Sequence, residues 1–90
     1  MVVVRIPSPL RRLTGGNDRV EVEGDRLVAV LDALEGRYPG MKERLCAEDG
    51  SLRHFVNVYV NGEDVRHLGG LETATKSGDE VSIVPAVAGG

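Results

Sequence analysis

The chain has 90 residues, of which 41% are hydrophobic and 28% charged, and its formal net charge at pH 7 is −3. A chain of this length forms one domain with one modest core, and the negative charge argues against a nucleic-acid-binding surface. No apolar run approaches the about 20 residues of a membrane span, and the single cysteine, Cys46, excludes an internal disulfide framework. We therefore expect a cytoplasmic protein that binds neither nucleic acid nor membrane.

The chain begins with two expected strands joined by a long connection. Residues 2–6 are apolar and mostly β-branched except for Arg5, which is typical of a central strand. Pro7 and Pro9 end this strand. Residues 19–23 alternate charged and apolar side chains, which is typical of a strand with one face in water. We expect these two strands to form an antiparallel hairpin.

A helix follows, with Asp25 as its expected N-cap. Pro39-Gly40 ends the helix. Residues 41–47 predict a short second helix. The apolar stripe of the main helix recurs at helical spacing and must cover a sheet; its members are Leu27, Val30, Leu31, Leu34 and Tyr38.

Residues 55–60 form the clearest strand in the sequence, with the valines on one face and the other side chains on the opposite face. Asn61-Gly62 directly after it predicts a tight hairpin turn. A short partner strand is expected over residues 63–67. After an irregular crossing, residues 80–84 predict the last strand.

This element order predicts an α+β fold in which a mixed sheet of four to five strands has one main helix packed across it. If the first and last strands are neighbours in the middle of the sheet, the C-terminus leaves from a rigid central strand. We divide the chain into a folded domain, residues 1–84, and a flexible C-terminal tail, residues 85–90.

The tail, Pro85-Ala86-Val87-Ala88-Gly89-Gly90, consists of small residues and ends the chain. Pro85 cannot donate a ladder hydrogen bond, so it marks the expected end of the sheet. Because glycine has no Cβ, Gly89 and Gly90 can enter a channel too narrow for other residues. Six extended residues span at most about 20 Å. We therefore expect the chemistry at the Gly90 carboxylate; a frayed chain end is the alternative.

No cluster of side chains in the sequence forms a convincing catalytic or metal site. His54 and His67 lack metal-ligand spacing with any neighbour, and no phosphate-binding loop or nucleophile elbow is present. No histidine or lysine neighbours Cys46 to lower its thiol pKa, so we interpret Cys46 as a packing residue. We expect no bound cofactor or metal, and a substrate or binding module rather than an enzyme.

Three stretches resemble the ubiquitin-like sulfur-carrier proteins of the MoaD/ThiS family, and most of all the CysO-type carriers of actinobacterial cysteine biosynthesis. They are residues 55–62, 77–81 and 85–90, and with residues 2–16 they extend the likeness over nearly the whole chain. The resemblance implies the β-grasp fold. Ala86 stands where MoaD-type members usually carry a second proline, which argues against a strict molybdopterin assignment.

The resemblance also implies a mechanism and partners. An E1-like adenylating and sulfurtransferase enzyme would use ATP to convert the Gly90 carboxylate into an acyl-adenylate and then a thiocarboxylate, with residues 85–89 entering partner active sites. A PLP-dependent synthase would accept the sulfur for cysteine, and a metalloprotease would release the product. Molybdopterin, a thiosugar and other thio-metabolites stay open as acceptors.

An exposed apolar patch of Val84, Tyr59 and Phe55 is the expected docking surface for these partners. The resemblance places an apolar enzyme contact at Val84. The alternative for the patch is partial cover by residues 41–52. We expect a monomer in the free state. The alternative functions are a ubiquitin-like modifier, with Gly90 joined to a lysine of a target, and a docking domain without sulfur chemistry.

Overall fold

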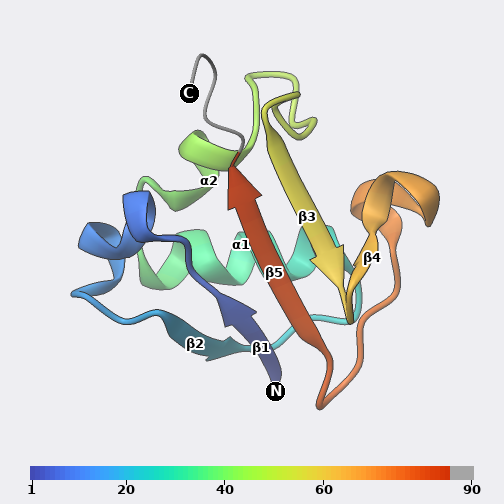
Figure 1. The fold of residues 1–90 in the computed structure, drawn as a ribbon, viewed down its shortest axis with the longest axis horizontal. Helices are drawn as coiled ribbons and strands as arrows, with labels where there is room; N and C mark the ends of the chain where they lie inside the picture. The colour runs from blue at the N-terminus through green and yellow to red at the C-terminus, as the bar shows by residue number, and fades with distance from the viewer. Residues whose placement is uncertain (86–90) are drawn as a thin grey trace.

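The computed structural model describes residues 1–85, which form a mixed five-stranded sheet with a helix across one face (Figure 1). Ala86 to Gly90 lie outside the described residues. The strands are β1 (Val2–Arg5), β2 (Arg19–Val22), β3 (Val56–Val60), β4 (Glu63–Asp64) and β5 (Glu80–Pro85). The helices are α1 (Leu27–Arg37) and α2 (Met41–Leu45), with three 3-10 segments, η1 (Ser8–Thr14), η2 (Val65–His67) and η3 (Gly70–Glu72).

The strands follow the order β2-β1-β5-β3-β4 across the sheet. β1 pairs antiparallel with β2 and parallel with β5, and β5 pairs antiparallel with β3. The first and last strands are therefore neighbours in the centre, which is the arrangement that lets the C-terminus leave from a central strand, and the predicted opening hairpin is confirmed. This arrangement is the ubiquitin-like β-grasp, so the predicted α+β fold class is confirmed.

The core lies between α1 and one face of the sheet. The predicted apolar stripe of α1 is buried along its length, except that Tyr38 at the C-cap is only partly buried. Alternate residues of the strands meet this stripe because successive side chains of a strand point to opposite faces. The buried strand residues are Val2, Val4, Val20, Val22, Val56, Val58, Val60, Val81 and Ile83.

The start of α1 differs from the prediction. Arg26, not Asp25, occupies the N-cap position, and its side chain makes no capping hydrogen bond. The Asp25 carbonyl accepts from the Thr75 amide at 3.0 Å, and the Leu27 amide donates to the Thr73 carbonyl at 2.9 Å. Because the backbone before Leu27 is paired with the segment that leads to β5, the helix begins only at Leu27.

The hairpin after β3 has the predicted turn. Asn61 and Gly62 both have positive φ, at 52° and 87°, as a tight two-residue hairpin turn requires. The predicted partner strand is shorter than expected, because β4 ends at Asp64. The Asp64 carboxylate accepts from the Arg66 amide at 2.9 Å and so caps η2. Among residues 1–85, no helix is long and apolar enough to cross a bilayer.

Candidate functional site

The site is the surface around the C-terminal end of β5, where the described part of the chain stops. β5 is the central strand, held by β1 on one side and by β3 on the other (Figure 1). It runs through Pro85, one residue further than predicted, and Pro85 pairs in register with Val56. A proline is tolerated here because it closes the strand. Gly89 and Gly90, the predicted centre of the chemistry, lie beyond the described residues.

A groove of about 540 Å³ opens beside Pro85, between η1, α2 and the segment that leads into β3. Most of its surface is apolar, and its polar lining consists of Glu43, Arg44 and Arg53 with the backbone of Gly40. The groove is made by four separate stretches of the chain, so no local pattern predicted it. Its apolar lining residues are Pro9, Leu10, Leu13, Leu45, Phe55, Val56 and Pro85.

Phe55 forms one wall of this groove and is 47% exposed. The segment that carries it is held by two arginines. Arg66 donates from Nη2 to the carbonyls of Val56 at 2.8 Å and Arg53 at 3.3 Å, and from Nη1 to Asn57 Oδ1 at 2.6 Å.

Arg53 in turn donates from Nε and Nη2 to the Glu43 carbonyl of α2, at 3.2 and 3.0 Å. Phe55 is thus exposed, but the backbone on both sides of it is fixed. No sequence pattern predicted the role of either arginine, because apart from Asn57 Oδ1 their partners are backbone carbonyls about ten residues away.

The predicted docking residues lie on two adjoining surfaces. Val84, 45% exposed, and the half-buried Tyr59 lie on the sheet face opposite α1. In the register of β3 with β5, Val84 is beside Asn57, and Tyr59 is beside Ser82, so Tyr59 and Val84 are diagonal neighbours. Phe55 lines the groove at the end of the sheet. α2 stands beside Phe55 in the groove and leaves it about half exposed.

The sequence comparisons give the family. The model of the ThiS family matches residues 4–90. The chain belongs to the ThiS family. The sulfur carrier protein CysO of Mycobacterium tuberculosis is 54% identical over 91 residues, which cover 99% of this chain and 98% of that protein. The resemblance to the MoaD/ThiS family and its CysO-type carriers is thereby confirmed.

Two further proteins are similar to this ThiS-family chain. A crystal structure of the Amycolatopsis orientalis BexX/CysO complex contains a chain with a TM-score of 0.94 and 50% identity, and the match covers all of both chains. Small archaeal modifier protein 3 of Haloferax volcanii is 49% identical over 70 residues, which cover 77% of this chain and 75% of that protein. The relatives thus include proteins named as carriers and as a modifier.

Side-chain chemistry is sparse in the described part of this ThiS-family protein. Cys46 is buried, and its burial raises the thiol pKa, so the thiol stays protonated at neutral pH. Lys42 lies near the thiol, which the sequence analysis did not expect, but its charge does not outweigh the burial. His54 and His67 are exposed. No group of three potential metal ligands occurs within residues 1–85.

Proposed function

We propose that this ThiS-family protein is a sulfur carrier whose Gly90 carboxylate is activated by an E1-like enzyme and converted into a thiocarboxylate. The observation that carries the proposal is the 54% identity, over 99% of the chain, to a protein named as a sulfur carrier. Gly90 follows the end of a central strand by five residues, which agrees with presentation of Gly90 to a partner enzyme.

The proposed reaction has two steps. The Gly90 carboxylate attacks the α-phosphate of ATP, and pyrophosphate leaves, which produces an acyl-adenylate. A sulfur donor then attacks the acyl carbon, and AMP leaves, which produces the thiocarboxylate. A free carboxylate is a poor electrophile, so the activating site must orient it and exclude water. β5 supplies a rigid base at Pro85 from which the last residues can be presented.

The protein is, in this proposal, a co-substrate and not a catalyst, and ATP and PLP belong to its partner enzymes. The proposed acceptor is the cysteine precursor held by a PLP-dependent synthase, after which an S-to-N acyl shift leaves a cysteinyl group on Gly90. A metalloprotease then hydrolyses the amide bond between Gly90 and the cysteine. The similarity to CysO supports this branch over molybdopterin or a thiosugar. The BexX/CysO complex supports docking of this chain on a partner protein.

A second function is a ubiquitin-like modifier, favoured by the 49% identity to small archaeal modifier protein 3. A lysine amine of a target protein would then attack the acyl-adenylate in place of sulfur. The two functions share the adenylation step and differ in the nucleophile that follows it.

Intact-mass spectrometry tests the proposal. The purified protein is incubated with ATP, a sulfide source and the E1-like enzyme of the same organism. We expect a mass increase equal to exchange of one oxygen for one sulfur, localised to the C-terminal peptide. Gly90→Ala and deletion of Gly90 should abolish the shift and leave the melting temperature nearly unchanged. A variant thiocarboxylated at the wild-type rate would contradict the proposal, and an isopeptide bond from Gly90 to lysine would favour the modifier.

A further inference from the structure

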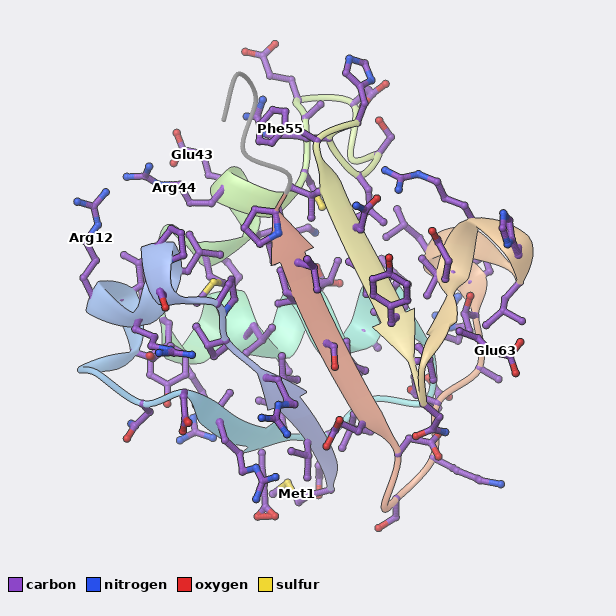
Figure 2. All side chains as sticks on the ribbon, in the orientation of Figure 1. Met1, Arg12, Glu43, Arg44, Phe55 and Glu63 are labelled. Carbon is purple, nitrogen blue, oxygen red and sulfur yellow. The ribbon has the colours of Figure 1, made fainter. Side chains whose placement is uncertain are left out.

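The groove beside Pro85 is lined by apolar residues together with two arginines. Arg44 and Arg53 line it, and Glu43 is the one acidic residue among its lining residues in the described part of the chain. Figure 2 shows Arg12 on η1 and Arg44 on α2 extending on the same side of the molecule, near the end at which β5 finishes. A locally positive surface therefore occurs on a chain whose net charge is −3.

The charges of these arginines are not neutralised inside the described chain. Within residues 1–85, no carboxylate lies within 4.0 Å of Arg12, Arg44 or Arg53, whereas Arg26 pairs with Glu72 at 2.8 Å. The hydrogen bonds of the Arg53 guanidinium run to a backbone carbonyl, which leaves its positive charge in place. Unpaired positive charge on a groove attracts an acidic partner.

The position of the groove limits what can cover it. Pro85 lines the groove, and five residues separate Pro85 from the chain end. At about 3.3–3.6 Å per residue, five extended residues reach about 18 Å at most. An enzyme that takes Gly90 into its active site must therefore approach the surface around Pro85, and the groove forms part of that surface.

We propose that this groove binds an acidic segment of the enzyme that activates Gly90. An apolar side chain of that segment packs against Phe55, Leu13 and Pro85, and its carboxylates pair with Arg44 and Arg53, with Arg12 adding long-range attraction. This inference rests on the proposed function and adds a second contact to the open sheet face that carries Val84. Because the backbone around Phe55 is already fixed, little conformational entropy is lost when the partner fills the groove.

The test compares charge reversals at two places. Arg44→Glu alters the groove, and Lys76→Glu makes the same change of net charge in the exposed loop before β5, at the other end of that strand. The assay is ATP–pyrophosphate exchange by the adenylating enzyme of the same organism with the full-length chain. We expect Arg44→Glu to raise the KM for the carrier at least about tenfold at low salt, with kcat unchanged. Lys76→Glu should change KM by less than about twofold.

A second pair of variants tests the apolar part. Phe55→Ala should raise KM, and Leu68→Ala should not, although the two side chains are 47% and 44% exposed. Circular dichroism melts check that all four variants fold. Equal KM values for Arg44→Glu and Lys76→Glu would contradict the proposal that the groove binds the enzyme, but not the proposed carrier function. A wild-type chain that supports no exchange would overturn both. A change of oligomeric state in Arg44→Glu, by light scattering, would show that the groove binds a second copy and overturn the inference.

Discussion

Asn61 joins the turn between β3 and β4 to the start of β5. Its backbone has φ 52°, which asparagine tolerates better than most residues. Its side chain donates from Nδ2 to Asp79 Oδ1 and accepts at Oδ1 from the Glu80 amide, both at 3.0 Å. Its own amide donates to the Glu80 carbonyl at 2.8 Å. One residue thus ties the hairpin to the strand that ends at the site.

Two substitutions of Asn61 separate the contribution of its side-chain hydrogen bonds from that of its positive φ. Asn61→Gly keeps the positive φ and loses both side-chain hydrogen bonds, so the free energy of unfolding should fall by about 1–2 kcal/mol. Asn61→Ala also strains the left-handed backbone and should lose about 1 kcal/mol more. Urea denaturation of the three proteins measures both values. Equal stability of the glycine variant and the wild type would show that the side-chain hydrogen bonds contribute nothing.

The pH dependence of the same variants identifies the role of the carboxylate. The hydrogen bond from Asn61, followed by the one from the Lys76 amide, holds the pKa of Asp79 below its usual value. A lowered folded-state pKa stabilises the protein above the unfolded-state pKa, and the effect is lost as the pH falls through the folded-state pKa. The difference in the free energy of unfolding between the wild type and Asn61→Gly should therefore become smaller in acid. If the difference in unfolding free energy does not change with pH, the Asp79 carboxylate does not contribute to it.

At the scale of elements, α1 shows what a periodic sequence predicts. Its buried face, its end before Pro39 and the sheet that it covers all follow from apolar spacing. Its start does not, because an N-cap preference is local, whereas the backbone of residues 25–27 pairs with residues 73–75. In the same way β4 was predicted too long, since the side chain of Asp64 turns the chain into η2.

The predicted docking residues show a similar limit. Alternation along residues 55–60 places Phe55, Asn57 and Tyr59 on one face. Phe55 precedes β3, however, and lines the groove with residues of η1 and α2. The composition of the groove could not be read from the sequence, because it depends on how four separate segments pack. The prediction for residues 85–90 needs only a local pattern, and it stays a prediction because residues 86–90 lie outside the described part of the chain.

The burial of one face of α1 predicts how substitutions on this helix change the free energy of unfolding. Leu34 is 0% exposed in the core, and Leu34→Ala should lower the free energy of unfolding by about 2–5 kcal/mol through lost burial and a cavity. That is a large part of the about 5–15 kcal/mol typical of a domain. Val28, half-buried on the same helix, is the control, and Val28→Ala should cost about 1 kcal/mol or less. Thermal and urea unfolding compare the two, and equal costs would contradict the packing of this face.

At the scale of the molecule, the folded core and the proposed chemistry occupy different parts of the chain. Within the described residues the buried apolar residues extend from Val2 to Ile83. The groove and the open face of the sheet also lie within residues 1–85. If Gly90 carries the reaction, recognition by the enzyme and reaction with it should be separable by truncation.

A chain that ends at Pro85 tests this separation. We expect its melting temperature to stay within a few degrees of the full-length value, because the buried core is retained. It should inhibit adenylation of the full-length chain competitively, with an inhibition constant within about tenfold of the KM, which is about 1.4 kcal/mol of binding free energy. The truncated chain with Arg44→Glu should inhibit more weakly, because its groove no longer attracts an acidic segment. A truncated chain that folds but does not inhibit would mean that the last five residues supply most of the binding, and that the surface around Pro85 contributes little.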